Sequence, residues 1–378
     1  MFPEKKRAIE RMKSLKPFLK TAALMAACAV TTASMASCGQ DTSWTYRTED
    51  GKYELTSGMY IGLSMNAYNE GYAQSGIDSS TPLYDQQINS QDALDWVKNR
   101  TDALAKKYLA VESKFDEYGL SFSNDEQTYI DSYISYYWGN MSSTYEAAGC
   151  AEKSYTSLMT NSFKESQLFF HIYGEGGERE VSEDDLRADF NDQYAHINVF
   201  QIDASDDDGN VLTGKDLELK QSLADDAVEA VKGGEDFESV KTEYTASSDS
   251  SDSSDTSSDT SSDTSSDTSS DTSSDSTDED TDTSSYILKS NTTYPEDLVK
   301  ALFSAKAGDC GSYDDGNGTI YVWTRLENDD NGFATYRNTV LQNEKWEEFT
   351  QYEQDWVNGM TFVTNDASIK KHSPKNLK

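Results

Sequence analysis

The sequence predicts an α+β fold in which a block of helices is joined to a smaller domain with an antiparallel sheet and flanking helices. Three observations predict this fold class. Apolar residues recur at three- and four-residue steps through 87–194, the period of helices packed on one side. Beyond residue 195, short apolar strands alternate with short helical patterns. A Ser/Asp repeat at 247–285 interrupts this second region without ending it.

The N-terminus has the features of a secretory signal peptide. Basic residues precede Thr21–Val30, an apolar stretch shorter than the roughly 20 residues that a membrane-spanning helix needs. Small residues then lead to Met35-Ala36-Ser37-Cys38, which is similar to the lipobox, where bacterial lipoproteins are cut before a lipid-bearing cysteine. We therefore expect residues 1–37 to be removed and Cys38 to carry a lipid; a signal peptide without a lipid is the alternative. The lipid would hold the mature chain at the outer face of the bacterial cytoplasmic membrane.

The charge of the chain limits its partners. The formal net charge is −36, and loss of the basic signal would make the mature chain more acidic still. An acidic surface repels phosphates and anionic lipid head groups, so nucleic acid is excluded as a partner. Cationic client proteins are favoured for the same reason.

The cysteines and histidines predict no metal site. Cys28 would leave with the signal and Cys38 would carry the lipid, so Cys150 and Cys310 remain. Their spacing demands no disulfide, and we expect two free thiols. The chain has three histidines and no C-x-x-C motif, which excludes the usual zinc patterns. No metal and no cofactor are predicted.

Four helices are predicted in the region 87–194. The first ends near Gly119, and the second begins with the capping-box pattern Ser123-Asn124-Asp125-Glu126. The fourth begins at Ser182, which precedes three acidic residues. The apolar positions that define these helices, in chain order, are Leu94, Val97, Thr101, Leu104, Tyr108, Val111 and Phe115; Ile130, Tyr133, Ile134 and Tyr137; Tyr155, Leu158, Met159, Phe163, Phe169 and Phe170; and Leu186, Phe190 and Tyr194.

The pattern changes at residue 195, where strands begin to alternate with helices. Strands are predicted at Ala195–Ile202, Tyr286–Leu288 and Thr319–Leu326, and a turn is predicted between Gly308 and Gly311. Helical spacing is carried by Leu219, Leu223, Ala227 and Val231 before Gly233-Gly234; by Phe237, Val240 and Tyr244; by Leu298, Leu302 and Phe303 after Pro295; and by Leu341, Trp346, Phe349, Tyr352 and Trp356 near the C-terminus.

The repeat from Ser247 to Ser285 is built on the unit SSDT and contains no apolar residue. A segment of this composition buries too little apolar surface to offset the entropy of ordering, so we expect it to be disordered. Its aspartates lack the glycine and the terminal glutamate of an EF-hand loop, which favours a solvated spacer over a calcium site.

Three segments and the order of the elements resemble the PrsA/SurA group of extracytoplasmic foldases, which carry a parvulin-type prolyl isomerase domain. Ser182–Val199 is similar to the family's helix leading into a first strand with a histidine. Ala227–Thr245 is similar to its helix–Gly–Phe–helix stretch, and Pro295–Gly311 to its second motif, which begins with Pro-Glu. The resemblance covers most of the mature chain at low identity.

The resemblance implies a division of the chain. In order, it comprises a signal peptide at 1–37; a lipidated segment that begins the chaperone domain at 38–86; a helical SurA/PrsA-like chaperone domain at 87–194; a parvulin-like domain at 195–328 with the disordered insert 247–285; and, at 329–378, a helix that returns to the chaperone domain, followed by a basic tail.

A parvulin accelerates rotation about an X–Pro bond, whose barrier is about 18–20 kcal/mol, and it needs no cofactor. By resemblance, His196 occupies the family's first histidine position. Leu298 falls near a phenylalanine of the family's proline pocket, and Thr293 or Tyr294 near its methionine. The second family histidine belongs near Ile320, and the chain has none there. We therefore expect weak or absent isomerase activity; a buried histidine with a structural hydrogen bond is the alternative for His196.

The predicted function is that of an extracytoplasmic foldase or chaperone. Its partners would be unfolded or partly folded exported proteins and their proline-containing segments, and its contact with the membrane would be the lipid. A non-enzymatic surface lipoprotein, such as an adhesin or a ligand-capture protein, is the alternative, since Ser/Asp repeats occur in surface stalks. The repeat lies inside a predicted domain instead of next to the anchor, which argues against a stalk.

Aromatic residues concentrate in the second predicted helix. Their helical spacing is compatible with a packed core, and it is also compatible with a groove for unfolded chains. The sequence leaves both interpretations open for Tyr129, Tyr133, Tyr136, Tyr137 and Trp138.

Overall fold

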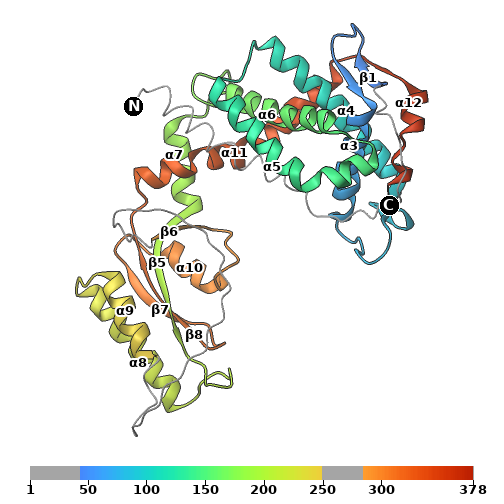
Figure 1. Cartoon of the computed structure of the whole chain (residues 1–378). Helices are drawn as coiled ribbons and strands as arrows, with labels where there is room; N and C mark the ends of the chain where they lie inside the picture. Colours follow the sequence, from blue (N-terminus) through green and yellow to red (C-terminus); the bar gives the residue numbers. More distant parts are fainter. Residues whose placement is uncertain (1–42, 249–283, 378) are drawn as a thin grey trace, which may run out of the picture. The chain divides into compact units, whose positions relative to one another are not determined.

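The computed structural model describes residues 43–248 and 284–377 and confirms the predicted α+β fold class. The predicted signal peptide, Cys38 and most of the Ser/Asp repeat lie outside these residues. The described chain forms two compact units (Figure 1). Unit 1 comprises the residues up to Ser182 together with those from Asn338 onward, and unit 2 spans Glu183–Arg337. The domain limits at 194 and 328 stay predictions.

Unit 1 is mainly helical, and the predicted helices of its central part are confirmed. They are α4 (Ala93–Glu117), α5 (Asn124–Ala148) and α6 (Glu152–Tyr173). The capping box of α5 forms as predicted: the Ser123 hydroxyl accepts from the Glu126 amide, and the Glu126 carboxylate accepts from the Ser123 amide. The later part of α11 (Asp330–Asn358) also belongs to unit 1.

Helix α3 (Ser57–Tyr72) was missed by the sequence analysis, which assigned no helix to that stretch. It is buried on most of its circumference, so its apolar residues show no one-sided period. Its small residues allow α6 to approach closely: a Cβ on Gly62 would lie 2.6 Å from Leu158 Cδ1 and 3.2 Å from Cys150 Sγ. Glycine at this position is therefore a packing requirement.

Short strands and the C-terminal segment complete unit 1. An antiparallel sheet has the order β2 (Glu54–Thr56), β1 (Trp44–Thr48), β9 (Phe362–Thr364). The remaining elements are the 3₁₀ turns Leu83–Asp85 and Pro374–Asn376, the hairpin of β3 (Gln87–Ile88) and β4 (Gln91–Asp92), and α12 (Asp366–Lys371).

The C-terminal tail, predicted only as basic, packs onto unit 1. Leu377 is buried in the core, and the Tyr84 hydroxyl donates to the Pro374 carbonyl at 2.8 Å. The tail is therefore part of the folded unit.

Unit 2 is built on a four-stranded antiparallel sheet with the order β6–β5–β8–β7. Its elements, in chain order, are α7 (Glu183–Gln193), β5 (Tyr194–Asp203), α8 (Lys215–Lys232), α9 (Phe237–Ser248), β6 (Ser285–Leu288), α10 (Glu296–Ser304), β7 (Cys310–Asp314) and β8 (Thr319–Arg325). The first turns of α11 belong to this unit. The predicted strands and helices of this region are confirmed, with β7 as an additional strand.

The two faces of this sheet carry separate cores. Side chains of a strand alternate between faces. Phe200 and Ile202 of β5 pack with α8 and α9, whereas Ala195 and Ile197 pack with α10. Figure 1 shows α8 and α9 on one side of the sheet and α10 on the other.

Three local expectations are corrected in unit 2. Leu219, assigned to the apolar side of α8, is 61% exposed; Ala227 is buried as predicted, together with Ala224 and Val228. Gly311, assigned to a turn, lies inside β7, where a Cβ would come within 2.9 Å of the Trp323 ring. The ends of the predicted insert are ordered, because α9 runs to Ser248 and β6 starts at Ser285.

Among the helices of the described residues, none has the length and apolar character to cross a membrane.

Candidate functional site

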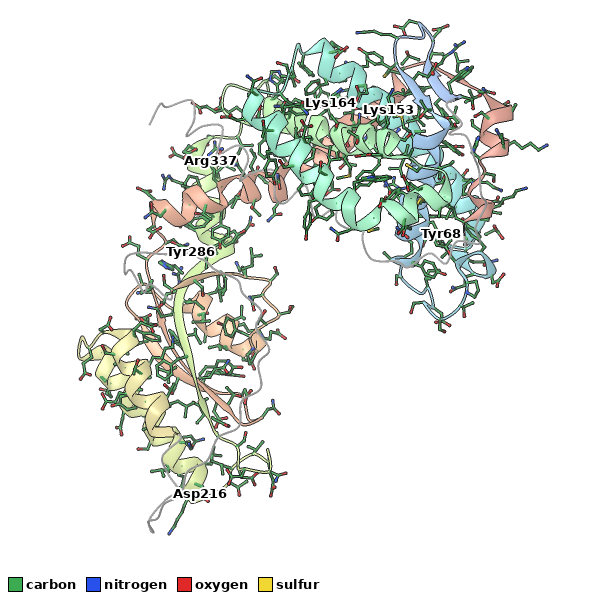
Figure 2. The ribbon with its side chains drawn as sticks, viewed as in Figure 1. Tyr68, Lys153, Lys164, Asp216, Tyr286 and Arg337 are labelled. Atoms are coloured by element: carbon green, nitrogen blue, oxygen red, sulfur yellow. The ribbon has the colours of Figure 1, made fainter. Side chains whose placement is uncertain are left out.

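His196 lies near the start of β5 and is 8% exposed. It pairs across the sheet with Tyr286 of β6, and the two rings stack with centroids 4.2 Å apart and planes inclined by 10°. Figure 2 labels Tyr286 in unit 2. One face of the imidazole is therefore covered by the chain's own aromatic ring.

Both ring nitrogens of His196 are engaged. Nδ1 lies 3.0 Å from the Glu327 carbonyl oxygen, which only accepts, so the hydrogen bond assigns the proton to Nδ1. Nε2 lies 2.7 Å from Ser284 Oγ, and in the neutral ring it accepts the proton of that hydroxyl. The protein thus satisfies the imidazole internally, and a substrate would have to displace Ser284 to reach Nε2.

Tyr286 is held in turn by the connection between β8 and α11. Its hydroxyl donates to Asp329 Oδ1 at 3.0 Å, and the same carboxylate oxygen accepts from the Gly332 amide at 2.6 Å. The Gly332 hydrogen bond lowers the pKa of Asp329. An ionised Asp329 therefore fixes both Tyr286 and the first turn of α11.

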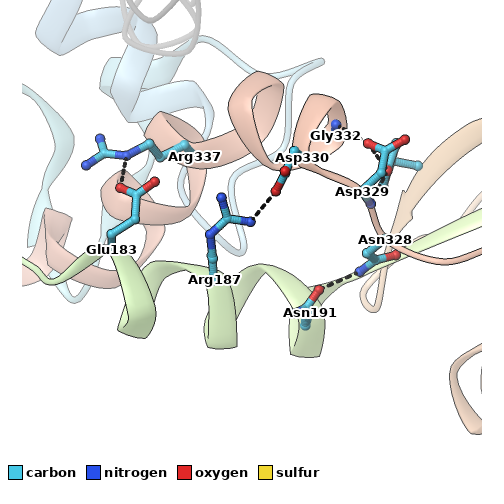
Figure 3. A network of polar contacts seen from close by, with 9 residues as sticks. Glu183, Arg187, Asn191, Asn328, Asp329, Asp330, Gly332 and Arg337 are labelled. Carbon is cyan, nitrogen blue, oxygen red and sulfur yellow. Dashed lines mark hydrogen bonds and ion pairs between the residues drawn. The ribbon is translucent and has the colours of Figure 1, made fainter.

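A polar network ties this connection to α7 (Figure 3). Glu183, Arg187 and Asn191 are four residues apart, so they lie on one side of α7, and each has a partner in the segment that follows β8. The contacts are Arg337 Nε to Glu183 Oε2 at 2.9 Å, Arg187 Nη1 to Asp330 Oδ1 at 2.7 Å, and Asn328 Nδ2 to Asn191 Oδ1 at 3.2 Å. Exposed pairs of this kind contribute about 0–1 kcal/mol each, so their role is mainly to position the segment.

Asn328 links the network to the histidine. Its Oδ1 accepts from the His196 amide at 3.1 Å, and its Nδ2 donates to the Tyr194 carbonyl at 2.9 Å. The residue that precedes it, Glu327, supplies the carbonyl for the imidazole. Sequence reasoning found His196 but missed Ser284 and Glu327, because a backbone carbonyl and a serine of a low-complexity repeat carry no sequence signal.

The predicted substrate-binding residues meet on the α10 face of the sheet. Leu298 is fully buried in the core there. Tyr294 is partly buried and meets Tyr321 edge to face, with ring centroids 6.0 Å apart. Tyr313 adds a third ring, 6.4 Å from Tyr321. The result is a tyrosine cluster in which the partly buried Tyr294 and Tyr313 flank Tyr321, a buried residue of the core that also contains Leu298.

His196 does not join this cluster. It shares its face of β5 with Phe200 and Ile202, whereas its neighbours Ala195 and Ile197 point to the α10 face. Ile320 pairs with Ile202 at the far end of β5, so a histidine at that position would not adjoin His196 in this register. A prolyl ring on Tyr294 would therefore lie across the sheet from the imidazole.

The described residues contain no group of three or more His, Cys, Asp or Glu side chains arranged to hold a metal ion. The two remaining thiols are free, with Cys150 buried and Cys310 partly buried. Burial raises the pKa of both, which disfavours the reactive thiolate.

Replacing Gly332 with alanine should destabilise unit 2 by about 1–3 kcal/mol. The added Cβ would collide with the Tyr286 ring, so the ring must leave its stack on His196. Urea unfolding measures the loss, and a shift of the His196 imidazole proton resonances reports the displaced ring. Gly139→Ala in α5 is the control: apart from the adjoining backbone of α5, no atom lies within 4 Å of its Cβ, so it should stabilise its helix by up to about 1 kcal/mol. Equal effects of the two substitutions would contradict the packing described here.

Comparison with known proteins gives distant similarities only. No family model matches the chain, and no curated protein sequence matches it. Among solved structures, the chain is similar to the foldase protein PrsA from Lactococcus lactis, with 10% identity, a TM-score of 0.36, and coverage of 89% of this chain and 100% of that chain. It is also similar to the foldase protein PrsA from Streptococcus pneumoniae str. Canada MDR_19A, with 11% identity, a TM-score of 0.36, and coverage of 77% and 97%.

Proposed function

We propose that the protein is an extracytoplasmic folding factor that holds unfolded or partly folded exported proteins and has little or no prolyl isomerase activity. The tyrosine cluster on the α10 face carries this proposal, because both residues predicted to contact a prolyl segment lie there. Aromatic rings bind prolyl rings through their apolar faces, and tyrosine hydroxyls can donate to the carbonyls of an extended chain.

The position of His196 supports binding without efficient catalysis. Faster rotation of an X–Pro bond requires groups that stabilise the twisted amide more than the planar one. His196 lies on the other face of the sheet from Tyr294, and its two nitrogens bond to Glu327 and Ser284. A prolyl segment on the tyrosine cluster would be bound, but the barrier to rotation about its X–Pro bond would be almost unchanged.

The charge and the proposed location agree with such a role. The net charge of −36 attracts cationic segments and repels anionic lipid head groups. A lipid on Cys38 would place the protein where exported chains emerge unfolded. Because β6 pairs with β5, the two flanks of the Ser/Asp repeat belong to one sheet. This pairing argues against the alternative in which the repeat is a stalk between an anchor and a separate adhesive head.

Two assays on the mature protein without its lipid test the proposal. We expect it to suppress aggregation of a chemically unfolded client protein. We also expect NMR exchange spectroscopy on X–Pro peptides to show the uncatalysed rate, with a time constant of about tens of seconds, for wild type and for His196→Ala alike.

Tyr294→Ala should weaken binding of proline-containing peptides about threefold or more, because it removes one ring of the cluster. Tyr244→Ala is the matched control: Tyr244 is also partly buried, but it packs on the α8/α9 face. Catalysis by wild type that His196→Ala abolishes would show that the protein is an isomerase. Absence of both aggregation suppression and peptide binding would refute the proposed function.

A further inference from the structure

Helix α5 of unit 1 carries a row of tyrosines. Tyr129, Tyr133 and Tyr137 follow one another at four-residue steps, with ring centroids 6.2 Å and 4.5 Å apart. Tyr136 stands beside the row, edge-on to Tyr137 at 5.3 Å, and is 69% exposed. We call these four residues the α5 tyrosine row. It is separate from the tyrosine cluster of unit 2.

The row is anchored from beneath. Tyr129 and Tyr133 both contact the buried Phe163 of α6 edge to face, with centroids 6.4 Å and 5.6 Å apart. Tyr129, Tyr133 and Tyr137 remain only partly buried against the core. Rings fixed from one side lose little further freedom when a ligand packs on the other, which favours binding. The sequence left open whether these rings form a packed core or line a groove for unfolded chains. In the structure the same rings pack on the core with one side and are partly exposed on the other.

Helix α5 also carries charge of one sign. Its sequence from Asn124 to Ala148 contains four carboxylates and neither lysine nor arginine. Glu126 is buried in the capping box, whereas Asp125 is exposed four residues before Tyr129, one helical turn away on the side of the row. The π-face of a tyrosine attracts cations, and nearby carboxylates add to this attraction. An anionic lipid surface or an acidic segment would be repelled.

We propose that the α5 tyrosine row binds extended cationic segments of unfolded exported proteins, in which Arg or Lys alternates with apolar or prolyl residues. The cation would lie over an exposed ring, and the apolar neighbour would cover the next ring along the helix. This inference rests on the proposed function and names the class of client segment that unit 1 selects.

The test uses fluorescence anisotropy of the mature protein without its lipid and a labelled peptide of Arg-Pro-Tyr repeats. A second peptide carries citrulline in place of every arginine, which keeps the shape and removes the charge. We expect the citrulline peptide to bind at least about threefold more weakly, and added salt to reduce the difference. Tyr136→Ser should weaken binding of the arginine peptide about threefold.

Further variants locate the site. Asp125→Asn should reduce both affinity and salt dependence for the arginine peptide, whereas Asp131→Asn, two residues from Tyr129 and Tyr133 and so on the opposite side of α5, should reduce them less. Leu219→Ser, which removes a similarly exposed apolar side chain in unit 2, should change nothing. A photo-crosslinking residue at position 136 should capture the peptide, whereas one at 219 should not. Both positions are exposed, so folding should not be at risk.

The outcomes separate this inference from the proposed function. Equal affinities for the two peptides, or unchanged binding by both Tyr136→Ser and Asp125→Asn, would overturn the inference. If aggregation suppression persists in that case, the proposed function stands. If aggregation suppression is absent while arginine-dependent binding at α5 is found, the α5 site stands and the folding role fails.

Discussion

Replacing Lys107 with methionine is expected to lower the free energy of unfolding of unit 1 by about 3–5 kcal/mol near neutral pH. Lys107 of α4 joins three helices: its Nζ lies 2.9 Å from Glu165 Oε1 of α6 and 2.9 Å from Glu353 Oε2 of α11. The Glu353 side chain is only 4% exposed and that of Glu165 15%. Without the ammonium group, Glu165 and Glu353 would lose the donor they share, and the charge of the poorly hydrated Glu165 would have no counter-charge from Lys107.

Urea unfolding followed by circular dichroism measures this loss. Lys300→Met is the control, because Lys300 is 63% exposed and pairs with Glu296 and Asp297 on the surface of α10. Its substitution should change stability by no more than about 0.5 kcal/mol. If the two substitutions had equal effects, the charge cluster of Lys107, Glu165 and Glu353 would not contribute to the stability of unit 1.

The same cluster predicts how stability depends on pH. Burial raises the pKa of Glu353 above its usual range, and the charge of Glu165 acts in the same direction, whereas Lys107 lowers it. In the folded state Glu353 therefore keeps a proton that it would release at about pH 4.3 in the unfolded chain. Stability contributed by this proton is lost as pH rises from that value through the folded-state pKa. Glu353→Gln keeps the shape without the charge, so it should flatten this slope.

Much of the fold was predictable because it depends on local patterns. The spacing of Val97, Thr101 and Phe115 marks one buried side of α4, and all three are buried as expected. The capping box at Ser123 and the glycines after α8 fixed helix ends for the same reason. Such signals involve residues a few positions apart, and they do not depend on what the rest of the chain does.

The elements that were missed depend on distant partners. Helix α3 is enclosed by α4 and α6, so burial on most of its circumference erased the period that identifies a helix. The tail residue Leu377 is buried because Tyr84 and its neighbours receive it, which a basic C-terminal sequence does not reveal.

The candidate site was predicted in part for a similar reason. Resemblance located His196, Tyr294 and Leu298, but only the three-dimensional structure shows that β5 places the histidine on one face and the other two beside the opposite face. Strand alternation followed from the sequence, whereas the pairing of His196 with Tyr286 and Ser284 did not, since a long repeat separates them. Register across such an insert is set by tertiary packing.

Helix α11 offers a test of the two units, because a single helix supplies aromatic anchors to both. Phe349 is fully buried in unit 1, with its ring edge-on to Phe169 at 5.3 Å and to Trp356 at 5.8 Å. Phe333 is buried in unit 2, where it meets Phe190 at 5.7 Å and the Arg187 guanidinium at 4.3 Å. Each phenylalanine thus belongs to a different core.

Phe349→Ala and Phe333→Ala should each cost about 3–5 kcal/mol, but in different units. Hydrogen exchange followed by mass spectrometry resolves this: Phe349→Ala should accelerate exchange in peptides from α4 and α6, and Phe333→Ala in peptides from α7 and β5. Each variant serves as the control for the other, since residue type, helix and volume change are the same. Acceleration of both sets of peptides by either variant would mean that the chain unfolds as one cooperative body. Separate responses would mean that a ligand bound to one unit would stabilise that unit alone.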